Sequence, residues 1–230
     1  MGSARVALRA GSIVTTLSVL IGASLAQNAG TLERMKRQAL DNLLGTMSVQ
    51  AEPSFTAGEF VGCLMVFDVL AKDFIYKQGG YIKVGGSFGF RSVKGTLGVT
   101  LKVVLHDLDP QTMNGIPSPP ASAYFVSGNK TTKSSVVGSY PSDIPGAIVV
   151  LLQLQPNVSI LTDGLMHDKV TIAFAREPGG ADVQLAIDTS VAATTADGQR
   201  THSLKPRADF AACSTELFES VHSTASTTRP

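Results

Sequence analysis

Residues 81–106 read YIKVGGSFGFRSVKGTLGVTLKVVLH, and this stretch decides the fold class. Val, Ile, Leu, Thr and Phe gather in three runs within it, at Tyr81–Val84, Ser87–Val93 and Thr96–His106. Two turn-forming pairs, Gly85-Gly86 and Lys94-Gly95, separate the runs. β-branched and aromatic residues are enriched in strands, and glycine supplies the turns between them. The stretch therefore predicts successive antiparallel strands.

The same pattern continues on both sides of this stretch. Further strand-forming runs lie at Ala123–Val126, Ala147–Leu154, Lys169–Ala175 and Val183–Thr189, with turn formers such as Pro156-Asn157 between them. Phe60–Ile75 fits both a helical stripe and a strand, and we favour the strand because its neighbours are strands. No strand–helix–strand alternation occurs. We predict a mainly β fold, with α+β as the alternative class, arranged as a single antiparallel β-sandwich or barrel-like domain.

Two helices are expected to flank this domain. Thr31–Met47 carries apolar residues at three- and four-residue steps, which predicts an amphipathic N-terminal helix. Ala51-Glu52-Pro53-Ser54 then reads as a linker. Ala208–Val221 predicts a short C-terminal helix, and the small, polar residues 222–230 predict a disordered tail.

The first 26 residues have the order of a secretory signal peptide. Arg5 and Arg9 form a positive head, an apolar run follows from Ile13 to Leu25, and Ser24-Leu25-Ala26 offers a small-residue cleavage site before Gln27. The alternative is an uncleaved anchor, but the run is shorter than the roughly 20 apolar residues that span a bilayer. We therefore predict a secreted or periplasmic protein divided into a signal peptide (1–26), an N-terminal helix with linker (27–52), a β-rich domain (53–221) and a tail (222–230).

The charge balance excludes some partners. The chain has 19 Lys and Arg against 18 Asp and Glu, and cleavage would remove Arg5 and Arg9, which leaves the mature chain close to neutral. No basic cluster is present, so we expect no nucleic-acid partner. After cleavage no apolar run is long enough for a transmembrane segment.

The two cysteines, Cys63 and Cys213, lie near opposite ends of the mature chain. In an oxidising compartment two cysteines have one intramolecular pairing, so we predict a Cys63–Cys213 disulfide. Two buried free thiols are the alternative.

The pattern closest to a catalytic motif is Gly85-Gly86-Ser87-Phe88-Gly89, which matches the nucleophile elbow GxSxG. An elbow needs a helix after the serine, whereas Phe88 to Val93 reads as strand. A glycine-rich hairpin corner explains the same letters, so Ser87 is a weak candidate nucleophile, and an enzyme is the less favoured interpretation.

No metal or cofactor site is predicted. His106-Asp107-Leu108-Asp109 puts one imidazole and two carboxylates together, but alternation along a strand sends them to opposite faces. The histidines show no zinc-binding spacing. Two N-x-S/T sequons, at Asn129 and Asn157, would mark surface loops in a host that glycosylates exported proteins.

Two long segments are expected to be irregular, the proline-rich 107–122 and the polar 127–145. Loops on a rigid β scaffold are common binding sites. We favour the second segment and name its candidate binding residues as Asn129, Lys130, Thr131, Lys133 and Tyr140. Deletion of 129–134 is expected to weaken binding with little loss of stability.

The sequence thus favours an exported, non-enzymatic envelope or secreted protein that binds an unknown protein or small ligand through its loops. A secreted hydrolase using Ser87 is one alternative. A structural subunit that assembles through the 31–47 helix is the other, and it requires an exposed apolar stripe on that helix.

Overall fold

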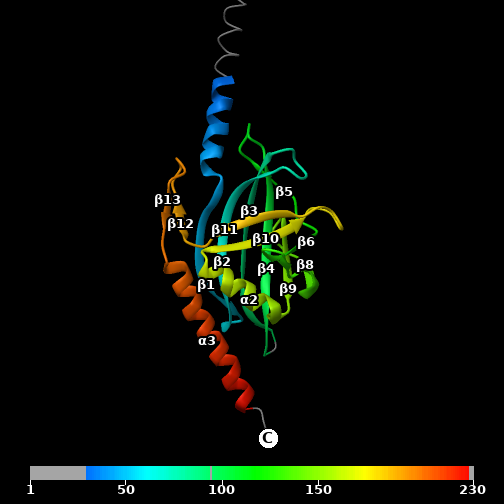
Figure 1. The fold of residues 1–230 in the computed structure, drawn as a ribbon, viewed down its shortest axis with the longest axis vertical. Coiled ribbons are helices and arrows are strands. Elements are labelled where there is room, and N and C mark those ends of the chain that lie inside the picture. The colour runs from blue at the N-terminus through cyan, green and yellow to red at the C-terminus, as the bar shows by residue number, and fades with distance from the viewer. Residues whose placement is uncertain (1–29, 94, 228–230) are drawn as a thin grey trace, which may run out of the picture.

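The computed structural model describes residues 30–93 and 95–227, and antiparallel strands dominate it (Figure 1). The predicted leader (1–26) lies outside the described residues. In chain order the strands are β1 Gly45–Thr56, β2 Glu59–Asp73, β3 Gly80–Val93, β4 Thr96–Leu108, β5 Gly115–Pro117, β6 Ser122–Ser127, β7 Lys130–Thr131, β8 Val136–Pro141, β9 Ala147–Leu152, β10 Lys169–Ala175, β11 Val183–Asp188, β12 Val191–Thr194 and β13 Arg200–His202. The predicted mainly β, antiparallel fold is confirmed.

The helical elements are an N-terminal helix (30–43), the short 3-10 helix η1 Lys133–Ser135, α2 Leu154–Met166 and α3 Lys205–Thr227. Within the described part of the chain, none of the helices is long and apolar enough to cross a membrane.

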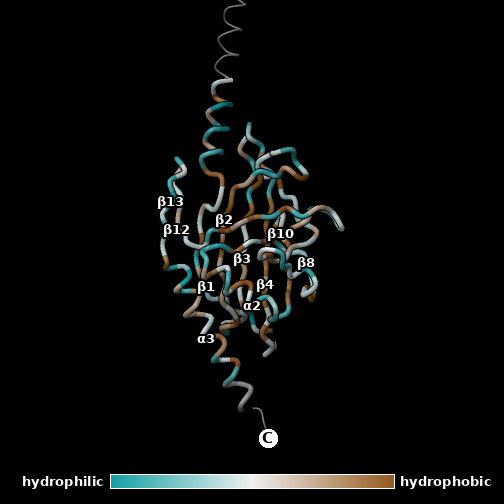
Figure 2. The backbone as a smooth tube through the Cα atoms, in the orientation of Figure 1, coloured by the Kyte–Doolittle hydropathy of each residue, from teal (hydrophilic) through white to brown (hydrophobic). Residues whose placement is uncertain are grey.

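The largest sheet has the order β1-β2-β3-β4-β9-β8. Strand β9 pairs with residues 99–104 of β4, and β5 pairs with residues 106–108 on the same edge of β4. A smaller sheet, β11-β10-β6-β7, crosses one face of it (Figure 1). The two sheets share one core, to which the large sheet contributes Met65, Phe67 and Phe88 and the small sheet Phe125 and Phe174. Hydrophobic residues follow the long central strands (Figure 2). Neither sheet closes into a barrel, so the architecture is an open sandwich.

The predicted turn at Gly85-Gly86 is wrong, because β3 runs through it without a break. Gly86 pairs with Phe67 on one side and with Val103 on the other. A Cβ atom on Gly86 would overlap the carbonyl oxygen of Lys102, and one on Gly89 would overlap that of Cys63. These glycines therefore permit close backbone approach inside a strand.

The N-terminal helix ends four residues earlier than expected, and the predicted linker at 51–54 is instead part of β1. Gly45, at φ +109°, redirects the chain at that point. The Arg200 guanidinium donates to the carbonyl oxygens of Leu43 (3.3 Å), Leu44 (2.5 Å) and Thr46 (2.9 Å), which fixes the chain where it passes from the helix into β1. Pro53 is tolerated because β1 is an edge strand.

The predicted disulfide is confirmed. Cys63 in β2 is bonded to Cys213 in α3, and their Cα atoms lie 5.8 Å apart. Helix α3 is longer than expected and includes residues 222–227 of the predicted tail. Its apolar side packs against β3, where the rings of Phe210 and Phe218 lie 5.7 and 5.2 Å from the ring of Phe90.

Helix α2 was not predicted, because Pro156-Asn157 reads as a turn and the preceding residues as strand. The structure ends β9 at Leu152 and places these residues at the start of the helix. Proline is compatible with a first helical turn, where its missing N–H group has no intrahelical partner to lose. Ile160 and Leu161 of α2 enter the core.

Candidate functional site

The predicted binding residues do not form one loop. Asn129, Lys130 and Thr131 lie on the exposed hairpin between β6 and β7, in the small sheet. Tyr140 lies on β8, the outermost strand of the large sheet. The segment that joins them is largely ordered as η1 and β8. The structure thus places these candidates on edges of two different sheets.

Lys133 is already engaged within the chain. Its ammonium lies 5.2 Å from the centre of the Tyr124 ring and 3.7 Å from Asp182 Oδ2. The Tyr124 hydroxyl donates to the same Asp182 carboxylate. Burial, together with this hydrogen bond to a carboxylate, raises the pKa of Tyr124 to about 12. Lys133 therefore helps to hold β6 against the segment before β11.

This cluster predicts a stability loss in strong base. The unfolded Tyr124 ionises near its ordinary pKa of 10, whereas the folded one keeps its proton up to about 12. The contribution of Tyr124 to the free energy of unfolding should therefore be constant below pH 10 and fall by roughly 3 kcal/mol as the pH rises from 10 through the folded pKa. Denaturation curves across this range should show a smaller decline for Tyr124→Phe. The exposed control Tyr140→Phe should decline like the wild type. An equal decline in all three proteins would contradict the assignment.

The segment after the hairpin is anchored by a buried polar chain. Thr132 is fully buried, and its hydroxyl oxygen accepts a hydrogen bond from the Phe125 amide at 3.0 Å. The Ser135 hydroxyl donates to the Thr132 carbonyl (2.7 Å) and accepts from Asn157 Nδ2 (2.8 Å). Deletion of 129–134 would remove Thr132 from this chain, so we now expect it to lower stability.

Ser87 does not lie on an elbow. It occupies the middle of β3, opposite Val66 and Lys102 in the neighbouring strands, without the strand-to-helix turn that exposes a nucleophile. Alternation along β3 directs it away from the core that receives Phe88. The hydrolase interpretation gains no support from this position.

One serine does contact a histidine. Ser190 Oγ lies 2.8 Å from His202 Nδ1, but the same hydroxyl donates to Asp188 Oδ1 at 2.6 Å. Because a hydroxyl has one proton, Nδ1 must donate in this arrangement. A histidine that acts as a general base must instead accept the hydrogen bond from the serine hydroxyl. The contact therefore fits a turn that joins β11 to the β12–β13 hairpin.

The carboxylates predicted at the end of β4 have structural roles. Asp109 accepts hydrogen bonds from the Gln111 amide (2.8 Å) and the Thr112 hydroxyl (3.0 Å), as expected for a turn-capping residue. Among residues 30–93 and 95–227, no three His, Cys, Asp or Glu side chains group in a way that could hold a metal ion.

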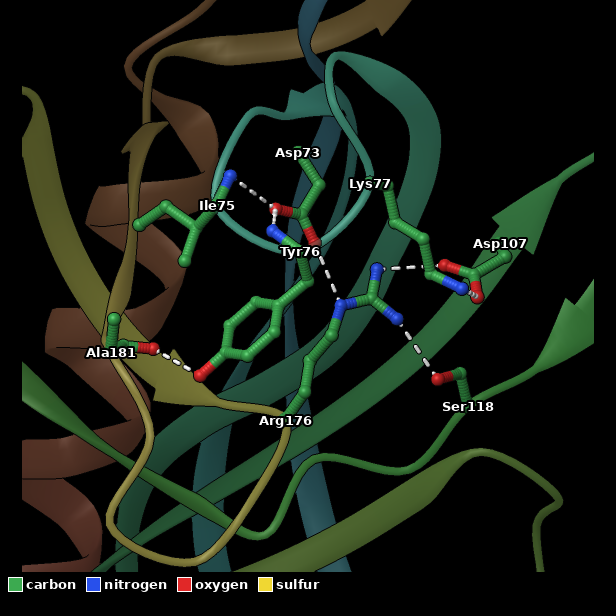
Figure 3. Close-up of polar contacts among 8 residues, drawn as sticks. All are labelled: Asp73, Ile75, Tyr76, Lys77, Asp107, Ser118, Arg176 and Ala181. Atoms are coloured by element: carbon green, nitrogen blue, oxygen red, sulfur yellow. Dashed lines mark hydrogen bonds and ion pairs between the residues drawn. The ribbon is translucent and has the colours of Figure 1, made fainter.

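Asp107 belongs to a buried ion network that joins the two sheets (Figure 3). Arg176, which follows β10, donates to Asp73 (2.7 Å), Asp107 (2.7 Å) and the Ser118 hydroxyl (2.9 Å). Lys77 lies 2.8 Å from the other Asp107 oxygen. Burial alone would raise the pKa of Asp107, but the bonds from Arg176 and Lys77 outweigh it and lower that pKa below its ordinary value. Every charge in this network has a partner, so we assign it a structural role.

The N-terminal helix packs on its own domain only through its C-terminal end. Leu40 is buried against Leu70 and Tyr81, with Leu43 and Leu44 packed beside them. Leu32 and Met35 remain exposed near the start of the helix. Only the N-terminal half of the stripe therefore remains exposed for the assembly that the subunit hypothesis proposes.

An apolar hollow lies between α2 and α3, and we call it the α2–α3 groove. It has a volume of about 740 Å³. Both helices form its walls, and β3 contributes the phenyl ring of Phe90. The lining residues from the helices include Val158, Leu165, Met166, Ala211 and Phe218. Met166 and Leu204 stand at its rim, 73% and 67% exposed. An exposed apolar surface in a concave site is typical of ligand binding.

Two buried polar groups in this groove lack an internal partner. Ser214 is 8% exposed, and no group in the described part of the chain bonds its hydroxyl. The same holds for Arg207 Nε, although Nη1 of that guanidinium pairs with Asp168 (2.6 Å) and the Leu165 carbonyl (2.7 Å). Buried polar groups are nearly always hydrogen-bonded, so these two point to a missing partner.

Sequence reasoning missed the groove because it missed α2. Val158, Leu161 and Leu165 repeat at three- and four-residue steps, which was the available signal. A second hollow, about 660 Å³ and more polar, includes Lys130, Thr131 and Asp163. Lys130 and Thr131 are two of the predicted binding residues, and Asn129 directly precedes Lys130 in the chain.

Comparison with known proteins finds no matching family model, no matching curated protein and no matching solved structure. The site is therefore interpreted from its own geometry.

Proposed function

We propose that this protein is an exported, non-enzymatic binding protein that holds an apolar small molecule in the α2–α3 groove. The observation that carries the proposal is the mostly apolar α2–α3 groove of about 740 Å³, whose lining includes the buried and unpartnered Ser214 hydroxyl. Ligand sites commonly have volumes of about 300–1,000 Å³ and combine apolar walls with a few placed polar groups. The Cys63–Cys213 disulfide supports export, because such bonds persist in oxidising compartments.

The unpartnered groups also suggest the chemistry of the ligand. Residues 207 and 214 are two helical turns apart, roughly 10 Å along α3. Arg207 Nε can only donate a hydrogen bond, and Ser214 Oγ can donate or accept one. Asp168 already balances the positive charge of Arg207, so the ligand does not have to be an anion. We therefore favour an elongated hydrocarbon that carries neutral oxygen acceptors, such as a monoacylglycerol.

A titration with a pyrene-labelled monoacylglycerol tests this proposal. The wild type should give saturable binding. Ala211→Trp should weaken the affinity about tenfold or more, because the indole would occupy the groove. Ala212→Trp is the matched control, since Ala212 is exposed on the same helix and does not line the groove. Equal affinities for the two variants, or no binding by the wild type, would contradict the proposal.

Ser214→Ala should separate binding from stability. Without ligand the change removes a buried hydroxyl that has no partner, so the free energy of unfolding should rise by about 1 kcal/mol. With ligand it removes a hydrogen bond, so the affinity should fall about two- to tenfold. Thermal unfolding and the same titration measure the two effects. A stabilised variant with unchanged affinity would show that Ser214 does not contact the ligand.

A further inference from the structure

The two sequons lie in opposite environments. Asn129 is exposed at the tip of the β6–β7 hairpin, where Ser127 pairs with Lys130 across the two-residue loop Gly128-Asn129. Gly128 has φ +57°, a conformation that glycine adopts readily and that suits the first position of such a loop. The third sequon residue, Thr131, is exposed as well.

Asn157 is fully buried at the start of α2. Its Nδ2 atom donates to Ser135 Oγ and to the Gln153 carbonyl oxygen, both at 2.8 Å. A sugar attached to this nitrogen would replace one of its two hydrogens, so it would break at least one of these bonds and occupy space that is closed. A chain modified at Asn157 could not reach the described fold.

We infer that Asn129 is an N-glycan acceptor and that Asn157 is not. The inference rests on the proposed export, because the modification takes place in a secretory pathway. The co-reactant is a sugar chain linked to a lipid pyrophosphate. A bond forms between Asn129 Nδ2 and the anomeric carbon, the carbon–oxygen bond to the pyrophosphate breaks, the pyrophosphate leaves with the electron pair, and the amide nitrogen loses one proton.

A glycan at this position would change how the surface near it can be used. Lys130 and Thr131, which follow Asn129 directly, line the more polar hollow beside Asp163. A bulky, hydrated chain at the hairpin tip would stand beside that hollow and hinder a protein partner there. The α2–α3 groove shares none of the residues that line this hollow, so it would stay accessible.

The test uses secretion from a eukaryotic cell line in two forms, one with the native leader and one with a surrogate leader placed before Gln27. Secreted protein is treated with an N-glycan-releasing amidase, which converts the modified asparagine to aspartate, and its peptides are measured by mass spectrometry. Two variants each remove one sequon at an exposed position, Asn129→Gln and Ser159→Ala. The second leaves the buried Asn157 side chain unchanged.

We expect a single glycan, released from Asn129, in the wild type and in Ser159→Ala, and none in Asn129→Gln. Secreted protein without a glycan at Asn129, or with one at Asn157, would overturn the inference. Failure of the native leader alone would count against export, because the surrogate-leader form still reports on Asn129. The two failures are therefore distinguishable.

Discussion

Replacement of Arg176 by methionine should lower the free energy of unfolding by about 3–5 kcal/mol. Asp73 is fully buried, and its Oδ2 atom accepts from Arg176 at 2.7 Å. The backbone amides of Ile75 and Tyr76 donate to its other oxygen, but they supply no full charge. The variant would therefore leave a buried carboxylate without a cation, as well as an unpaired Ser118 hydroxyl.

Urea denaturation of Arg176→Met measures this loss. Arg37→Met is the control, because Arg37 is exposed and its ion pair with Glu33 lies on the helix surface, where a change of at most about 0.5 kcal/mol is expected. Adding Asp73→Asn to Arg176→Met should restore part of the stability, since the buried charge is then removed. A loss below about 1 kcal/mol in the single variant would contradict the role given to the network.

The network also sets the response to acid. The pKa of Asp107 is lower in the folded protein than in the unfolded chain. The stability that Asp107 contributes is therefore fully present above the unfolded pKa, and it is lost as the pH falls through the folded pKa. Arg176→Met should flatten this acid-side decline, because the largest hydrogen-bond contribution to the shift comes from Arg176.

Removal of the disulfide should also cause a large loss in the free energy of unfolding. Cys63 and Cys213 are 150 residues apart, and closing a loop of that length stabilises a fold by about 3–5 kcal/mol on the chain-entropy account. Cys63→Ala/Cys213→Ala should therefore lose that amount in urea denaturation, and reductant should do the same to the wild type. The double variant should also bind the pyrene-labelled probe more weakly, because the disulfide fastens α3, one wall of the groove, to β2. A loss below about 1 kcal/mol would rule out this contribution.

Much of the sheet structure was predictable from residue pattern. Runs of β-branched and aromatic residues identified β4, β10 and β11 closely, because such residues fill a pleated, half-buried surface. Gly85-Gly86 led to a wrong prediction of a turn, because glycine occurs both in turns and where two strands approach closely. Only the position of the neighbouring strand distinguishes the two cases. The GxSxG letters arose from the same glycines.

The candidate site was less predictable. Irregular, polar sequence pointed to 127–145, where the structure instead shows a hairpin, η1 and an edge strand. The α2–α3 groove depends on packing between α2 and α3, two helices far apart in the chain. Ser214 looks like any helical serine in the sequence, and only its burial without a partner singles it out. The disulfide was predictable because two cysteines permit one pairing.

Photo-crosslinking with a monoacylglycerol that carries a diazirine in its acyl chain tests the central claim most directly. The reagent labels whatever residues surround the bound hydrocarbon, and peptide mass spectrometry then locates the label. Label confined to α2 and α3, around Val158–Met166 and Leu204–Phe218, and lost in Ala211→Trp but kept in Ala212→Trp, is the result we predict. Label on the 127–133 hairpin or at Tyr140, or no saturable labelling, would contradict the assignment of the groove as the binding site.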